Sequence, residues 1–360
     1  MSKILRKTNK KRLLVLACCK AKLYKNEKCK CKYIKIIKKI FKLWKIKVNN
    51  LPKVEYNKCE INFKDINLFI DSIKKDNYKR SENDKNNKKR ENIIASIINS
   101  KLPIIYFKYS LRWNRLKQLI INFIKKLCKM KDIKKYENII CIHKAGRNNY
   151  FDFKIIVNEI EFNIEFKFNA CSINDTPQFI SPMKPSQYLE SSYEEYFYNN
   201  YLIKIIKNKE YNLNLPDIKE YLKQIHSSNP KCMKNFQEKY YKGCKQSSKY
   251  SGNENDIKFY EKMKKISKES IYNFICLYDL KYDKLSNYLL NTQKNKYYML
   301  YKNNNIYLQT IDQDNYKIKE VVKEPKHSRY IASTKSGKKL YILLRWKNGN
   351  GIAYPSFQIS

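Results

Sequence analysis

The sequence has few residues that interrupt regular structure: its 360 residues include only 6 glycines and 9 prolines. No apolar run reaches the roughly 20 residues that a transmembrane helix needs, so no segment is expected to cross a membrane. The apolar stretch 13–19 is too short for a secretory signal, and no convincing small-residue cleavage site follows it. These absences predict an intracellular protein of the cytoplasm or nucleus, not a secreted one.

Several motifs that would assign a function by spacing alone are also missing. Residues 336–339 read Ser-Gly-Lys-Lys, without the upstream glycine of a phosphate-binding P-loop. The cysteines at positions 18–31 lack the paired C-x-x-C spacing of a zinc site. The 11 cysteines, an odd number without a secretory signal, predict reduced thiols. The three histidines are isolated, and His143 is expected to be an ordinary strand or loop residue.

Positive charge is what the sequence has in excess. Lys and Arg total 76 against 33 Asp and Glu, a net charge of +43. This balance favours a polyanion as partner, nucleic acid first. However, the accompanying excess of Asn, Ile and Tyr is typical of translation from an AT-rich genome, which raises the lysine content without any function. Lysine outnumbers arginine, which suits contacts to phosphate more than the reading of bases.

Composition and periodicity divide the chain into five segments. They are a basic, largely helical N-terminal region (1–73), a polar linker (74–91), an α/β core (92–210), a helical segment (211–290) and a β-rich C-terminal segment (291–360). The linker is assigned because it is dense in Lys, Asn, Asp and Ser and has almost nothing apolar.

Two segments leave alternatives open. Residues 33–47 predict a cationic amphipathic helix, which packs on its own domain, lies along a phosphate backbone or binds an anionic membrane; a membrane is the least favoured partner. In the C-terminal segment, residues 297–310 and 340–359 each predict a hairpin. These strands either bind substrate or form a packed accessory sheet.

The most informative pattern lies in residues 150–168. From Ile160 to Phe168 every even position is apolar and every odd position is polar. From Phe151 to Val157 the odd positions are apolar, and Ile156 is the single apolar residue on the other face. Because side chains alternate between the two faces of a sheet, both runs predict half-buried antiparallel strands.

The link between these runs, Asn158-Glu159, predicts a hairpin in which paired positions sum to 317. Phe153 then faces Ile164, and the next pair is Asp152 with Glu165. A slip of one residue would turn the apolar face to water, so the pattern itself fixes the register.

The predicted pair of carboxylates, Asp152 and Glu165, is unfavourable in a bare sheet. At roughly 5 Å and an effective dielectric near 20 their repulsion is on the order of 3 kcal/mol. A divalent cation reverses the sign of this interaction, polarises a phosphoryl oxygen and lowers the pKa of a bound water. Lys167 shares the face of Glu165 and is placed to hold or activate such a water. The alternative is a solvated sheet face on which Lys154 and Lys167 merely pair with the acids.

The acid at the start of one strand and the Glu165-Phe-Lys167 triplet on the next resemble the core motif of the PD-(D/E)XK, or restriction-endonuclease-like, nuclease superfamily. The resemblance covers residues 102–207. It implies an α/β fold in which helices flank a central mixed sheet, in the order α-β-β-β-α. Here that order corresponds to a helix over 112–130, a strand over 138–143, the two strands of the hairpin and a helix over 186–207.

The resemblance also implies roles for individual residues. Asp152, Glu165 and the backbone carbonyl of Phe166 would hold Mg²⁺ or Mn²⁺, and Lys167 would position or activate the attacking water. Gln178 matches a polar residue that some members place near the substrate.

The sequence departs from the family pattern at two points. Phe151 stands where the family often has proline. No clear acid precedes the first strand on a helix, where Glu91 and Glu137 are the only loose candidates.

The predicted function is metal-dependent hydrolysis of phosphodiester bonds in nucleic acid, with a DNA endonuclease favoured over an enzyme acting on RNA. The alternative is a catalytically inactive nucleic-acid-binding protein with the same fold, which the missing helical acid would explain. Cutting both strands of a duplex would require two active sites, so a homodimer stays open.

Overall fold

A computed structural model describes residues 51–70, 80–144, 149–175, 180–207, 214–227, 231–246, 248–347 and 355–360. The predictions for the helix 33–47, the cysteines at 18–31 and Gln178 lie outside these residues. The chain divides into two compact units, one containing residues up to 176 together with 295–310, the other containing 177–294 and 311–360.

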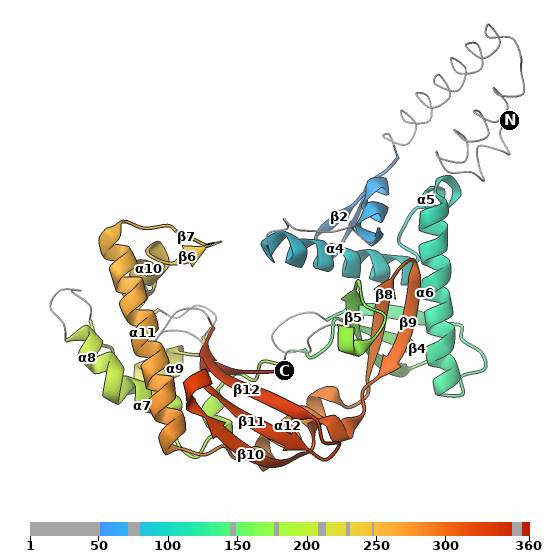
Figure 1. The fold of residues 1–360 in the computed structure, drawn as a ribbon. Helices are drawn as coiled ribbons and strands as arrows, with labels where there is room; N and C mark the ends of the chain where they lie inside the picture. The colour runs from blue at the N-terminus through green and yellow to red at the C-terminus, as the bar shows by residue number, and fades with distance from the viewer. Residues whose placement is uncertain are drawn as a thin grey trace, which may run out of the picture. The chain divides into compact units, whose positions relative to one another are not determined.

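The first unit is built on a five-stranded mixed sheet with the order β3-β4-β5-β8-β9 (Figure 1). The strands are β3 (Ile139–His143), β4 (Phe153–Val157), β5 (Ile160–Phe168), β8 (Lys296–Lys302) and β9 (Asn305–Thr310). All neighbours are antiparallel except β5 and β8, which run parallel. This sheet with its helices confirms the α/β class.

Helices cover the apolar face of this sheet. They are α4 (Arg80–Ile98), α5 (Ile104–Tyr109) and α6 (Leu111–Met130), preceded by the short strands β1 (Val54–Tyr56) and β2 (Cys59–Ile61) and the 3-10 helix η1 (Phe63–Phe69); another 3-10 turn, η2 (Ile173–Asp175), follows β5. The side chain of Ser110 caps α6 by accepting from the N–H of Trp113. Apolar residues at helical spacing then face the sheet, and they form one core with the apolar residues of β4 and β5.

The predicted hairpin register is confirmed. Val157 pairs with Ile160, Ile155 with Phe162 and Phe153 with Ile164. The turn residues Asn158 and Glu159 both have positive φ, 46° and 71°, as a type I′ turn requires. The Asn158 side chain stabilises this conformation by accepting from the N–H groups of residues 137 and 138 and donating to the carbonyl of residue 135.

The polar linker predicted for 74–91 is wrong over residues 80–91, because α4 begins at Arg80. Its polar side chains find partners that are distant in the sequence. Arg90, 3% exposed, donates from Nε to the carbonyl of Leu68 at 2.8 Å, and its guanidinium lies 3.7 Å from the ring centroid of Phe168. These contacts supply the stability that the local composition lacks.

The boundaries predicted for the core also need correction. The sheet of the first unit is completed by β8 and β9, so residues 296–310 belong to this core and not to a separate C-terminal segment. The helix expected over 186–207 belongs to the second unit. The reason is the parallel pairing of β5 with β8, which joins segments more than a hundred residues apart and leaves no local sequence signal.

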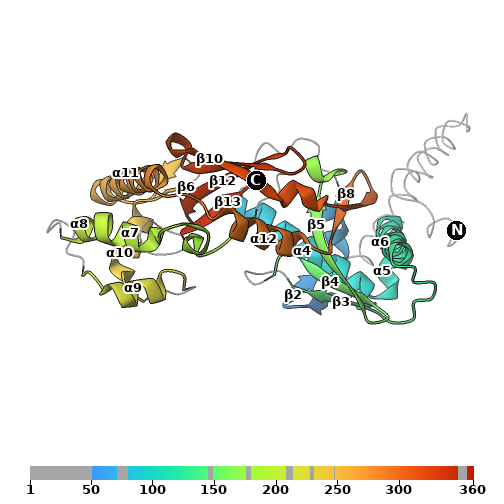
Figure 2. The same cartoon turned by 90° about the horizontal axis from the view of Figure 1, so that it is seen from below.

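The second unit contains a four-stranded antiparallel sheet, β10-β11-β12-β13, visible from two sides in Figures 1 and 2. The strands of this sheet are β10 (Ile318–Glu324), β11 (Arg329–Thr334), β12 (Lys339–Trp346) and β13 (Pro355–Ile359). The two-residue strands β6 (Lys245–Gln246) and β7 (Lys249–Tyr250) form a separate two-stranded sheet. The helices of the second unit are α7 (Tyr193–Phe197), the π-helical turn η4 (Tyr198–Leu202), α8 (Ile203–Ile206), α9 (Ile218–Gln224), α10 (Lys234–Lys242), α11 (Glu254–Leu277) and α12 (Tyr282–Gln293). The 3-10 turns are η3 (Pro185–Tyr188), η6 (Gln313–Tyr316) and η7 (Pro325–His327).

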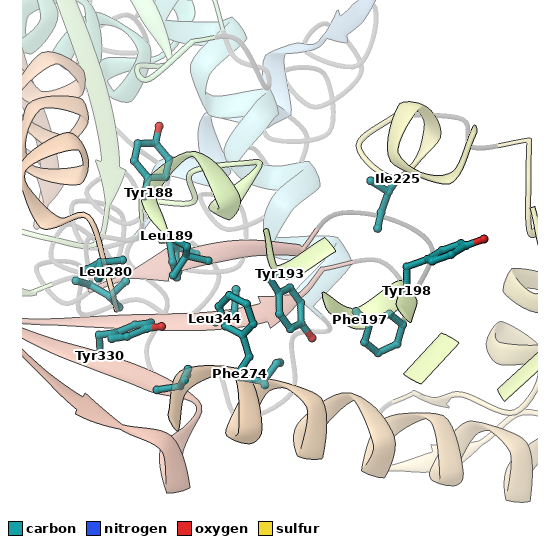
Figure 3. Packing of buried hydrophobic residues seen from close by; sticks show 14 of the residues in the cluster. Tyr188, Leu189, Tyr193, Phe197, Tyr198, Ile225, Phe274, Leu280, Tyr330 and Leu344 are labelled. Atoms are coloured by element: carbon teal, nitrogen blue, oxygen red, sulfur yellow. The ribbon is translucent and has the colours of Figure 1, made fainter. Parts of the chain in front are cut away.

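Aromatic side chains fill the core of the second unit (Figure 3). Tyr193 of α7 is fully buried, with its ring centroid 5.2 Å from that of Phe274 on α11. Its hydroxyl accepts from Trp346 Nε1 at 2.9 Å. Trp346 therefore takes part in packing, which favours the accessory-sheet alternative for this strand. No helix in the described part of the chain is long and apolar enough to span a membrane.

Replacing Arg90 tests whether buried polar contacts hold α4 in place. Arg90→Ala removes the hydrogen bond to Leu68 and the contact with Phe168, so we expect the free energy of unfolding to fall by about 2 kcal/mol. Lys88→Ala, on the exposed side of the same helix, is the matched control and should change it by less than about 0.5 kcal/mol. Chemical denaturation followed by circular dichroism measures both. Equal stability of the two variants would contradict this account.

Candidate active site

Three predicted residues, Asp152, Glu165 and Lys167, come together where β4 begins and β5 ends. The regular ladder stops at Phe153 and Ile164, so Asp152 lies one residue beyond it. Its N–H donates to the carbonyl of Ile164 at 2.9 Å, and its Oδ2 accepts from the N–H of Phe166 at 2.8 Å. Asp152 is thus bonded to the residues on both sides of Glu165. This arrangement replaces the regular ladder pair that the sequence predicted, and it keeps the two carboxylates neighbours.

The carboxyl group of Asp152 has a strongly perturbed pKa. Burial raises its pKa well above the ordinary value of 3.8, and the negative charges of Glu165 and Glu91 raise it further. The hydrogen bond from the Phe166 N–H opposes these effects without cancelling them. These surroundings therefore favour the protonated form of Asp152, and an added positive charge would favour the ionised form.

Glu165 has the opposite tendency. Burial acts to raise its pKa, but two ammonium groups outweigh it and the pKa is lowered. Lys167 Nζ lies 2.7 Å from Oε1, and Lys296 Nζ lies 3.4 Å from Oε2. The surroundings therefore favour the ionised form of Glu165 and the protonated form of Asp152. Two neighbouring carboxyls with pKa values pushed apart are a common feature of acid–base sites.

Lys167 is a cation in this arrangement. Burial acts to lower its pKa, yet Glu165, Asp152 and Glu91 together raise it. A lysine that holds its proton this firmly is poorly suited to take a proton from water. Its geometry favours orienting a water and offsetting phosphate charge over acting as a general base.

Glu91 on α4, named from the sequence only as a loose candidate, also belongs to the site, whereas Lys296 was not predicted at all. The charge of Glu91 acts on both Asp152 and Lys167, so it belongs to the same cluster. Its Oε2 lies 3.0 Å from Nε2 of His143, at the end of β3, and both side chains are largely buried. The only sequence signal was its place among loose candidates, since the surrounding segment was predicted as a linker.

Three other positions named from the sequence have different outcomes. Glu137 is exposed, and its N–H bonds to the side chain of Asn158 at the hairpin turn, the opposite end of the β4–β5 hairpin from Asp152. His143 is not an isolated strand residue but the partner of Glu91. Gln178 lies outside the described residues.

Glu91 is positioned by the residue before it. Arg90 lies over the ring of Phe168, which directly follows Lys167. Phe168 in turn stacks on Tyr301 of β8, with centroids 5.6 Å apart and planes at 13°. This stack fastens α4 to the end of β5 and brings Glu91 beside Lys167.

The donors at this site suit a hard cation. They are carboxylate oxygens, which Mg²⁺ prefers; burial and then repulsion by Glu165 and Glu91 raise the pKa of Asp152, and a cation would relieve that repulsion. Among the described residues, no three of the His, Cys, Asp and Glu side chains are gathered closely enough to enclose a metal. The carboxylates of Asp152 and Glu165 are donors of the kind that Mg²⁺ takes when one or two carboxylates and otherwise water surround it.

Comparisons of the chain with protein-family models, with curated proteins and with solved structures returned no match.

Asp152→Asn tests the buried carboxyl through the pH dependence of stability. Because the folded-state pKa is raised, the carboxyl leaves stability intact below its ordinary pKa of 3.8 and lowers it progressively as the pH rises through the folded-state value. Without metal, the asparagine variant should therefore be the more stable protein at about pH 8.5, by on the order of 1 kcal/mol, and the difference should shrink towards about pH 5.

Asp175→Asn is a control of opposite sign. Asp175 accepts from the N–H groups of Cys171 and Ser172, which lower its pKa to about 2. The ionised Asp175 carboxylate stabilises the fold above its ordinary pKa of 3.8, and this stabilisation is lost as the pH falls through about 2. The asparagine variant should therefore be less stable than wild type at neutral pH. Thermal melts across the pH range measure both variants. A pH-independent effect of Asp152→Asn would show that no strained carboxyl is present.

Proposed function

We propose that this protein is a metal-dependent nuclease of the PD-(D/E)XK type that hydrolyses phosphodiester bonds, with DNA favoured over RNA. The observation that carries the proposal is the hydrogen bond from the Phe166 N–H to the Asp152 carboxylate. It sets the first acid of the motif directly against the Glu165-Phe166-Lys167 triplet. A sheet face that merely carried solvated charges would have no need to bury these groups together.

Glu91 strengthens the resemblance at its weakest point. The sequence offered no clear helical acid before the first strand, and that gap motivated the catalytically inactive alternative. Glu91 lies on a helix that precedes β3, and its charge acts on Asp152 and Lys167, which supports this part of the proposal. The mixed sheet with helices on its apolar face is compatible with the restriction-endonuclease-like core that we propose.

Each of these residues then has a role in metal binding or hydrolysis. Asp152 and Glu165, with the backbone carbonyl of Phe166, would hold Mg²⁺ or Mn²⁺, which when bound supplies a water of lowered pKa and neutralises phosphoryl charge. Lys167 orients the attacking water against Glu165 and offsets the charge of the phosphate. Glu91, held by His143, adds an acceptor for a water at the edge of the site.

A polyanionic substrate is supported by the surface of α6. This helix carries Arg112, Arg115, Lys117, Lys125, Lys126 and Lys129 and no acidic residue, although acids accompany lysine elsewhere in the chain. Arg115, Lys126 and Lys129 are exposed and lie on one helical face. Such a stripe suits contact with a phosphate backbone.

One observation favours a second candidate, a nucleic-acid-binding protein without catalysis. Lys167 and Lys296 already contact both oxygens of Glu165, so the charge of this carboxylate is compensated without a metal. Calorimetry with Mn²⁺ separates the two candidates. Salt-sensitive DNA binding without any metal binding at Asp152 and Glu165 would favour the second.

Cleavage assays test the enzyme directly. Purified protein with Mg²⁺ or Mn²⁺ should cut plasmid DNA, and Asp152→Asn, Lys167→Met and Glu91→Gln should each lower the rate by about 100-fold or more, because each removes a charge from the proposed site. Glu161→Gln is the matched control, since Glu161 lies on β5, the strand of Lys167, but is exposed and paired with Lys154. If the first three variants cut like the control, the site assignment is wrong. A folded RNA assayed in parallel decides between substrates.

The basic face of α6 is tested by salt dependence. Replacing Arg115, Lys126 and Lys129 by glutamine should reduce the slope of log affinity against log salt for duplex DNA by about 2 to 3, since each phosphate contact contributes about 0.9. Glutamine at Lys264, Lys265 and Lys268 on α11 removes the same charge and should leave the slope nearly unchanged. Fluorescence anisotropy at several salt concentrations, without divalent metal, gives both slopes. Equal slopes would assign the binding to net charge alone.

A further inference from the structure

Lys296 is the one member of the charged cluster that no motif indicated. It is the first residue of β8, which runs parallel to β5, and it pairs with Asn163 in the ladder. Its Nζ lies 3.4 Å from Oε2 of Glu165, although the two residues are 131 positions apart in the sequence. The fold thus adds a second lysine to the acid of the Glu165-x-Lys167 triplet.

Burial separates Lys296 from the many other lysines of this chain. Its side chain is 7% exposed, and it is the only lysine among the described residues that belongs to the buried set. Withdrawing an ammonium from water is unfavourable unless a partner compensates it, and Glu165 is its ion-pair partner. An incidental lysine would extend into solvent, as lysines on sheet surfaces usually do.

The two lysines occupy different oxygens of the same carboxylate. Lys167 lies at Oε1 and Lys296 at Oε2, so neither oxygen is free of a positive charge. A divalent ion that approaches Glu165 meets two ammonium groups already in place. Binding at Oε2 requires that Lys296 move away or share the oxygen.

We propose that Lys296 is an internal counter-ion that holds Oε2 of Glu165 in the metal-free protein and competes with the divalent cation for it. This inference rests on the proposed metal site. Lys296 is a positioning residue: it keeps a buried carboxylate compensated and in place until metal arrives, and it lowers the affinity of the free protein for metal.

A purely structural role makes a different prediction. If Lys296 only stabilised the fold, its removal would loosen Glu165 and weaken metal binding. Competition predicts the reverse, because removing the competitor frees Oε2. A gain in metal affinity that accompanies a loss of metal-free stability is therefore specific to the proposal.

The experiment is a calorimetric titration of the full chain with Mn²⁺, without nucleic acid. Lys296→Met should bind Mn²⁺ on the order of tenfold more tightly than wild type. Lys296→Arg, which keeps the charge, should bind no more tightly than wild type. Lys154→Met is the matched control for the loss of one nearby charge, since Lys154 lies on the adjacent strand and pairs with Glu161, and its affinity should change little. Lys296→Gln provides the same measurement if the methionine variant does not fold.

The outcomes separate the inference from the proposed function. Equal affinity of wild type, Lys296→Met and Lys296→Gln, or a loss of affinity in the two uncharged variants, would overturn the counter-ion role and leave the metal site standing. A tenfold gain that Lys154→Met reproduces would also overturn it, since net charge would then explain the gain. Absence of Mn²⁺ binding in wild type and in every variant would overturn the metal site, and the counter-ion role with it.

Discussion

The structure of this site depends on one constraint: carboxylates that repel one another are held together where the interior strands β4 and β5 of the sheet meet. The Phe166 N–H fastens Asp152 beside Glu165, and the apolar face of the β4–β5 hairpin prevents the register from slipping. Since the chain cannot separate these acids, it must compensate them. The ammonium groups of Lys167 and Lys296 lie beside Glu165, and the surroundings of Asp152 raise its pKa and favour its neutral form.

The compensating positive charges come from two places in the fold. Lys167 is local, two residues along the same strand, whereas Lys296 arrives through the parallel pairing of β5 with β8. Glu91 adds a further negative charge and is held by His143 and by the neighbouring stack of Arg90 on Phe168. Ion pairs withdrawn from water contribute little net stability to a fold, since apolar residues of similar size often stabilise it equally well. Their concentration at one place is therefore better explained by function than by stability.

How much of this the sequence could predict depended on the range of each interaction. The hairpin, its register and helix α6 were predictable, because period-2 and helical patterns act over a few residues. Helix α4 was not: its stabilising contacts reach from Arg90 to Leu68 and Phe168, and the segment itself reads as a polar linker. Lys296 was equally hidden, because nothing in a strand's own sequence states which distant strand it will pair with in parallel. Glu91 was only a loose candidate in the sequence, because the helix that carries it was predicted as a linker.

Lysine abundance made the triplet a weak signal, and burial changes how it should be weighed. In a chain with 76 basic residues, a lysine two positions after a glutamate is expected by chance. A lysine that gives up hydration to reach that glutamate is not, since desolvating an ammonium is unfavourable wherever it occurs. Lys296 does so, with a side chain only 7% exposed, and it joins Lys167, which is 27% exposed, at the same carboxylate. The informative quantity is the number of buried charges that converge on one group, and only the folded chain provides it.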